Sequence, residues 1–307
     1  MRRETPPDAD SPALGDLVQP FQVEALGMRG RLVRLGPALE AILGGHGYPD
    51  PVAAMLAETL ALAAALAGGL KYDGIFTLQT QGDGPLGMIV ADVTSDGAMR
   101  GYARFDEARL AFTADTGGPV PRLLGSGHMA FTVDQGPDTE RYQGITELEG
   151  STLADCAHVY FRQSEQLETA ITLAATPAPI GKHGGAFAGA LMVQRMPADN
   201  SEAADDDWRR AVILMSTASA GELLDPALAP ADLLYRLYHA EGVRVFRTRP
   251  LHHACRRSRT KVEKTLASFP RSEIEAMAED GKVTVTCEFC RSAYVYGEDE
   301  LAALYAA

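Results

Sequence analysis

The chain has few of the residues that would tie it to a secreted or nucleic-acid-binding protein. Only four cysteines occur among 307 residues, too few for the disulfide framework of a secreted protein. Lys and Arg together number 28 against 41 Asp and Glu, and the net charge of −13 does not provide the basic face that phosphate binding needs. We therefore expect a cytoplasmic protein that binds no nucleic acid.

No apolar leader opens the sequence. Residues 1–13 are rich in Pro and Asp, so we expect a disordered tail in place of a signal peptide. Residues 52–70 are almost wholly apolar, but alanine dominates them, Glu58 interrupts them, and their length is marginal for a membrane span. A buried core helix without a membrane partner is the better interpretation.

Convincing catalytic motifs are also missing. Residues 82–85 (Gly-Asp-Gly-Pro) lack the Lys and Ser/Thr of a phosphate-binding loop and indicate a hairpin turn. Residues 125–128 (Gly-Ser-Gly-His) do not have the spacing of a nucleophile elbow. Cys156 lies on a predicted helix after residue 151, where a free cysteine usually acts as a small buried hydrophobe. We expect a protein without catalytic turnover.

The pattern of strands and helices predicts an α+β fold in three parts. Residues 14–197 alternate helical stretches with strand-like runs and Gly-rich turns, the first runs being 21–26 and 30–35, which indicates a large mixed core with mainly antiparallel sheet. Residues 198–250 begin polar and acidic and continue as modest helices, a helical linker. Residues 251–307 form a small module with short helices and a hairpin at 283–296.

That module carries a damaged cysteine pattern. Cys287-Glu288-Phe289-Cys290 is a CxxC knuckle, and Cys255 stands about thirty residues upstream. A CxC and a CxxC at that separation would supply four thiolates for tetrahedral zinc, but Arg257 occupies the second position of the CxC. Three thiolates can still hold zinc with a histidine, so His253, or else His252, is a candidate fourth ligand, although a solvent-exposed histidine pair is the more ordinary interpretation.

Several segments together resemble a known family over residues 14–305. They are 48–52 (YPDPV), 81–85 (QGDGP), 99–101 (MRG), 124–127 (LGSG), 140–144 (ERYQG), 160–166 (YFRQSEQ), 234–239 (LYRLYH) and the terminal CxxC. The chain resembles the bacterial redox-regulated holdase chaperones of the thirty-three-kilodalton heat-shock class, with a degenerate cysteine motif.

The resemblance implies an ATP-independent chaperone that binds unfolded client proteins under oxidative or heat stress. Family members hold zinc on four thiolates in the reduced, inactive state, and oxidation forms disulfides, ejects zinc and unfolds the redox domain and linker. The resemblance also allows a homodimer in the activated state. Here Arg257 replaces a family cysteine, so we expect weakened zinc binding by Cys255, Cys287 and Cys290, and a single internal disulfide, Cys287–Cys290.

Two other functions remain open at this point. A thiol–disulfide exchange enzyme could use Cys287 and Cys290, but an activated CxxC usually starts a helix, and this one is predicted in a hairpin. A binding module whose C-terminal part docks one stoichiometric partner is the third alternative.

Overall fold

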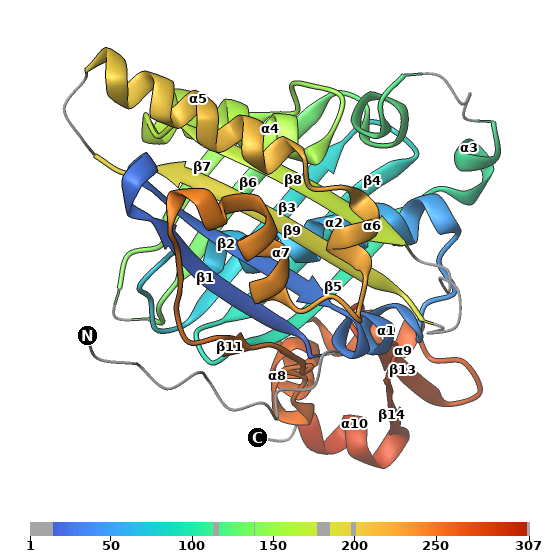
Figure 1. The fold of residues 1–307 in the computed structure, drawn as a ribbon. Helices are drawn as coiled ribbons and strands as arrows, with labels where there is room; N and C mark the ends of the chain where they lie inside the picture. Colours follow the sequence, from blue (N-terminus) through green and yellow to red (C-terminus); the bar gives the residue numbers. More distant parts are fainter. Residues whose placement is uncertain (1–14, 113–116, 138, 177–184, 198–200, 306–307) are drawn as a thin grey trace.

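The computed structural model describes residues 15–112, 117–137, 139–176, 185–197 and 201–305. Within them, two six-stranded sheets and one buried helix form the centre of the molecule, with further helices outside and a small module at one end (Figure 1). The predicted α+β architecture with mainly antiparallel strands is confirmed.

The first sheet has the strand order β10-β1-β2-β9-β8, with β11 also paired to β1, and all its pairs are antiparallel. Its strands are β1 (Leu17–Val23), β2 (Met28–Leu35), β8 (Thr169–Thr176), β9 (Phe187–Arg195), β10 (Val243–Val245) and β11 (Arg249–Pro250). Strand β1 begins four residues before the predicted run and contains Pro20. Pro20 has no N–H to donate, and it lies between the segments of β1 that pair with β11 and β10.

The second sheet has the order β12-β5-β4-β3-β6-β7, and the β12–β5 pair is its one parallel pair among the described strands. The strands are β3 (Ile75–Gly82), β4 (Leu86–Thr94), β5 (Ala98–Phe105), β6 (Gly127–Asp134), β7 (Tyr142–Glu147) and β12 (His252–His253). Strand β12 belongs to the C-terminal part of the sequence, so this part of the chain adds to the core sheet directly.

The predicted core helix is α2 (Asp50–Ala67), with Pro51 in its first turn as a helix start favours. Leu and Ala side chains on all sides of α2 are buried against both sheets. By length and composition α2 is the one described helix that could cross a membrane, but 78% of it is buried inside the protein. Its apolar character is explained by this position between two sheets.

Shorter helical segments complete the core. They are η1 (Glu24–Leu26), α1 (Pro37–Leu43), α3 (Glu107–Ala111), η2 (Val120–Leu124), α4 (Leu153–Tyr160) and η3 (Phe161–Glu165). Thr152 and Asp155 form a capping box at the start of α4. Cys156 on α4 is fully buried, and burial raises the pKa of its thiol to about 12, as befits an inert core residue.

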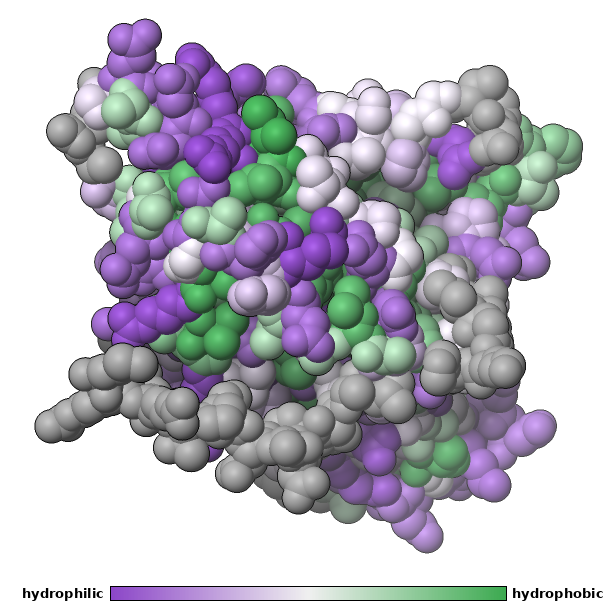
Figure 2. Space-filling view, viewed as in Figure 1, coloured by the Kyte–Doolittle hydropathy of each residue, from purple (hydrophilic) through white to green (hydrophobic). Residues whose placement is uncertain are grey.

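Helices α5 (Glu202–Ser216), α6 (Ala220–Leu224) and α7 (Pro230–Tyr238), followed by η5 (His239–Glu241), cover the outer face of the first sheet (Figure 1). Between these helices and the sheet lies a second apolar cluster, separate from the one around α2. Tyr238, which is fully buried, donates a hydrogen bond to Ala211 O at 3.3 Å and so joins α7 to α5. On its outside, this face is a mosaic of hydrophilic side chains and separate apolar patches (Figure 2).

Of the predicted module 251–307, Leu251 packs in the large core and His252–His253 pair with β5, whereas residues 255–305, called the C-terminal module from here on, have a small core of their own. Its elements are α8 (Arg259–Ala267), α9 (Arg271–Ala276), β13 (Lys282–Thr286), β14 (Ala293–Gly297) and α10 (Glu298–Leu304). Five buried residues form its core: Leu266, Ile274, Val283, Tyr296 and Leu301. A core this small is expected to contribute little stability on its own.

Candidate metal centre and its contact with the core

The three predicted cysteine ligands meet at one point of the C-terminal module. Cys287 and Cys290 lie in the turn between β13 and β14, and Cys255 comes from the segment after β12. The sulfur atoms of Cys255 and Cys287 are 3.7 Å apart, and all three sulfurs lie within 4.8 Å of one another. Within the turn, Arg291 N donates to Cys287 O at 2.8 Å, and Arg291 has a positive φ of 56°.

The donor set fits three of the four positions of a tetrahedral zinc site. Zinc–thiolate bonds of about 2.3 Å in a tetrahedron place sulfur atoms about 3.8 Å apart, close to the Cys255–Cys287 distance of 3.7 Å. Among the described residues, no histidine or carboxylate joins the three cysteines in this cluster.

Arg257 lies against the cluster. Its guanidinium donates a hydrogen bond to the sulfur of Cys290 at 3.4 Å and a short one to the hydroxyl of Ser292. The residue that interrupts the CxC therefore brings a permanent positive charge to the thiols, where a fourth thiolate would bring a negative one.

The thiols of this cluster differ in acidity. Burial raises the pKa of Cys255 to about 11, helped by hydrogen bonds with Cys290 and Cys287. For Cys290, burial also opposes ionisation, but hydrogen bonds with the side chain and backbone of Ser292 and from Arg257 outweigh it and lower the pKa to about 6. The cluster therefore holds one thiol that ionises readily and one that does not.

The two candidate histidines lie in β12, next to β5, and their ring nitrogens are outside the cysteine cluster. Burial lowers the pKa of His253, with a smaller effect from His252, so its ring is neutral near pH 7. The Nε2 atom of His253 is buried and has no hydrogen-bond partner. A buried ring nitrogen without a partner is rare, and a metal ligand is one role that would explain it.

A contact that the sequence pattern did not reveal joins the thiol turn to the core. Phe289, between the two cysteines of the CxxC, packs edge-on against Tyr102 of β5, with ring centroids 4.8 Å apart. The guanidinium of Arg100 lies 3.8 Å from the centre of the Phe289 ring. His46 Nε2 donates to Phe289 O at 3.2 Å. In the sequence, the aromatic residue inside the CxxC was the one sign of this contact.

An ion pair next to the cysteines strengthens this contact. Arg256 pairs with Asp92 of β4, which is 4% exposed. Arg100 donates to the same carboxylate at 2.8 Å, and Thr77 donates to it at 2.6 Å. Because Asp92 is buried, these bonds are screened less than surface ion pairs. The segment that carries Cys255 is thus held on the second sheet. We call the contacts of Phe289 and Arg256 with the core the docking contacts.

Comparison with known proteins places this architecture in a family. The model of the Hsp33 protein family matches residues 16–297. The 33 kDa chaperonin of Caulobacter vibrioides is 41% identical over 289 residues, which cover 93% of this chain and 96% of that protein. That of Ectopseudomonas mendocina is 35% identical over 298 residues, covering 95% and 96%.

A solved structure shares the fold. The 33 kDa chaperonin from Thermotoga maritima superposes with a TM-score of 0.78 at 22% identity, covering 95% of this chain and 98% of that one. The family match runs through both sheets, helices α5–α7 and the cysteine cluster, and this chain belongs to the Hsp33 family of chaperones.

Proposed function

We propose that this protein is a cytoplasmic, ATP-independent holdase that binds unfolding client proteins under oxidative or heat stress and that the thiol cluster regulates it. Family membership supports the chaperone activity. The observation that supports this regulation is a four-residue turn in which Phe289, which contacts the core, lies between Cys287 and Cys290. Any change at these thiols that moves the turn also moves the side chain that contacts the core.

The proposed client surface is the outer face of the first sheet. The cluster beneath α5–α7 includes Phe21 of β1, Met28 of β2 and Leu191 of β9, all buried by the helices. Sheet faces of this kind bind apolar segments of unfolded chains once they are uncovered. Strands β10 and β11 join the helices to the C-terminal module along the chain, so loosening the module removes one of the restraints on them.

Zinc would be held by Cys255, Cys287 and Cys290, with His253, or else His252, as the fourth ligand. A structural zinc supplies folding free energy to a small domain, about 10–16 kcal/mol in zinc-finger peptides. We propose that binding here is weaker than at a four-cysteine site, because Arg257 adds a positive charge instead of a ligand.

We propose that oxidation forms one internal disulfide, Cys287–Cys290. One peroxide accepts two electrons and two protons from the two thiols and becomes two water molecules. Both cysteines lie in the same short turn, so they remain neighbours when the module loosens, whereas Cys255 comes from another segment. Non-reducing mass spectrometry after peroxide treatment should find this disulfide with Cys255 unpaired; a dominant Cys255–Cys287 bridge would contradict it.

The activity itself is tested by aggregation of a heat-denatured client without ATP. The oxidised protein should suppress light scattering at stoichiometric amounts, and the reduced protein should do so less. A Cys287→Ser/Cys290→Ser variant cannot form the proposed disulfide, so it tests whether these thiols cause the gain in client protection on oxidation. Cys156→Ser, which changes a buried thiol outside the cluster, is its matched control. If the protein protects no client when reduced, oxidised or heat-activated, the proposal fails. Size-exclusion chromatography of the same samples would detect a homodimer formed on activation.

A further inference from the structure

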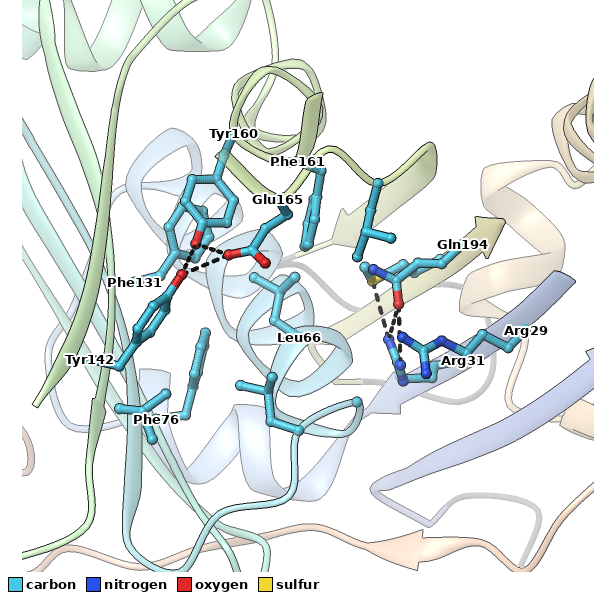
Figure 3. Close-up of a pocket in the computed structure, with 15 residues that line it drawn as sticks. Arg29, Arg31, Leu66, Phe76, Phe131, Tyr142, Tyr160, Phe161, Glu165 and Gln194 are labelled. Carbon is cyan, nitrogen blue, oxygen red and sulfur yellow. Dashed lines mark hydrogen bonds between the residues drawn. The ribbon is translucent and has the colours of Figure 1, made fainter. Parts of the chain in front are cut away.

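An open cavity of about 290 Å³ lies between the two sheets, away from the thiol cluster, and its lining includes the exposed side chains of Leu70 and Tyr142 (Figure 3). Its walls come from β2 and β9 of the first sheet, from β3, β6 and β7 of the second sheet, from the ends of α2 and α4 and from η3. This volume is near the lower end of pockets that bind small molecules, ~300–1,000 Å³. Neither the chaperone proposal nor the thiol switch uses this cavity.

One wall holds a buried positive charge without a negative partner. Arg31 of β2 is only 6% exposed, and its guanidinium donates two hydrogen bonds of 3.3 Å to the amide oxygen of Gln194. Among the described residues, no carboxylate pairs with Arg31. Burial, with smaller contributions from the positive charges of Arg29 and Arg249, lowers the pKa of Arg31 to about 10. An anion in the cavity would give this buried positive charge a negative partner and so lower the cost of burying it.

The backbone leaves room for the guanidinium. Gly69 follows the end of α2, and a Cβ atom there would lie 2.2 Å from the central carbon of the Arg31 guanidinium. Arg29, on the same strand and also lining the cavity, adds a second cation on that side (Figure 3).

The remainder of the cavity is largely apolar, with one acidic group on the side away from Arg31 (Figure 3). The apolar walls include Leu66, Phe76, Phe131, Val133, Phe161 and Met192. The hydroxyls of Tyr142 and Tyr160 each donate to the same carboxylate oxygen of Glu165, at 2.7 Å. That carboxylate would repel a second negative charge on a ligand, so the cavity favours a molecule with one anionic head and an apolar tail.

We propose that this cavity binds a medium-chain fatty carboxylate, with its head group at Arg31 and Arg29 and its chain along the apolar walls. Contact with the apolar walls supplies binding free energy but does not orient the ligand. The charge-assisted hydrogen bonds between the carboxylate and the guanidinium set the ligand's orientation. The chain length is limited by the cavity volume. This inference does not depend on the proposed chaperone function.

Isothermal titration calorimetry with decanoate, below its micelle concentration, tests the proposal on the full-length reduced protein. Decanoate should bind at one site per chain. Decanol, which lacks the charge, and decanedioate, which carries a second carboxylate for Glu165 to repel, should each bind at least tenfold more weakly. A chaperone that merely adsorbs apolar chains would not distinguish decanoate from decanol.

Two variants locate the site. Arg31→Gln should weaken decanoate binding at least tenfold, and it should fold, since it removes a buried charge without a counter-ion. Val133→Trp fills the cavity and should abolish binding. The matched control is Arg209→Gln on α5, whose side chain is 69% exposed and does not line the cavity. Unchanged affinity in Arg31→Gln, or no saturable binding to the wild type, would overturn the proposal.

An anion from the chain itself is the competing occupant. Residues 1–14 contain Glu4, Asp8 and Asp10. A protein that lacks these residues should bind decanoate with unchanged affinity. Tighter binding by that protein would assign the anion site to the acidic tail and would contradict the proposal.

Discussion

At the scale of single residues, Arg257 distinguishes this thiol cluster from a four-cysteine site. Its guanidinium touches the sulfur of Cys290, so the cluster has lost a ligand and gained a cation at the same time. We expect both changes to weaken the binding of a divalent metal ion, since a metal needs electron-pair donors and is repelled by a nearby positive charge. The two effects can be separated by mutation.

Arg257→Cys should raise zinc affinity at least about tenfold, or ~1.4 kcal/mol, because it supplies a fourth thiolate. Arg257→Gln removes the charge without adding a thiolate, so it should give a smaller increase. His253→Ala should lower the affinity if the unpartnered Nε2 atom completes the site. Competition with a chromophoric chelator measures all three. Equal chelator resistance in the wild type and Arg257→Cys would rule out the weakened site.

Glu58 on the buried helix α2 should make the protein less stable at neutral pH than a neutral residue would. Burial raises the pKa of its carboxyl group. Among the described residues, no hydrogen bond or ion pair compensates it. The folded-state pKa therefore lies above the unfolded value, so ionisation costs stability, and the cost appears as the pH rises through this range.

Glu58→Gln should consequently raise the urea midpoint at pH 7.5, and the gain should disappear as the pH falls below the unfolded pKa of about 4.3. Glu140→Gln, at an exposed site, is the control and should show no such pH-dependent gain. A gain that persists at low pH would mean that lost packing or lost hydrogen bonds, and not the charge, explain the effect.

At the scale of elements, the β13–β14 turn combines the thiols with the docking contacts. Phe289→Ala removes the contacts with Tyr102 and Arg100, which together contribute about 1–3 kcal/mol. We expect faster hydrogen exchange in residues 255–305 and greater client protection under reducing conditions, with all three cysteines intact. Phe269→Ala, whose ring is 47% exposed on the same module, is the control. The same exchange rates in both variants would show that docking does not restrain the module.

Local patterns predicted the elements but not their long-range partners. The apolar run at 52–70 predicted α2 because a helix enclosed by two sheets is apolar all round. The cysteine spacing predicted the thiol cluster because the CxxC knuckle is a local structure and Cys255 stands at the sequence distance typical of a second metal-binding segment. The contact of Phe289 with Tyr102 was not predictable, since it depends on where β12 joins the second sheet. Buried Arg31 was hidden for the same reason, because its surroundings come from both sheets.

At the scale of the whole molecule, the layered arrangement explains how the outer apolar face of the first sheet can be covered in one state and exposed in another. Helices α5–α7 bury one apolar cluster against the first sheet, while α2 lies in a separate apolar cluster between the two sheets. Loss of the outer helices would therefore expose apolar surface without opening the central core. The net charge of −13 helps such a species to stay dispersed, since like-charged molecules repel one another.

A charge placed under α7 should uncover this surface without any oxidant. Leu237 is 4% exposed in the cluster between α7 and the first sheet, whereas Tyr235 on the same helix is 65% exposed. Leu237→Asp would bury a carboxylate with no partner, at a cost of several kcal/mol, so α7 should leave the sheet instead. We expect stronger fluorescence of a hydrophobic dye and client protection in the reduced state, with the zinc content unchanged. Tyr235→Asp adds the same charge on the solvent side and should leave both readouts at the wild-type level. If Leu237→Asp folds and binds no more client than Tyr235→Asp, the outer face of the first sheet is not the client surface.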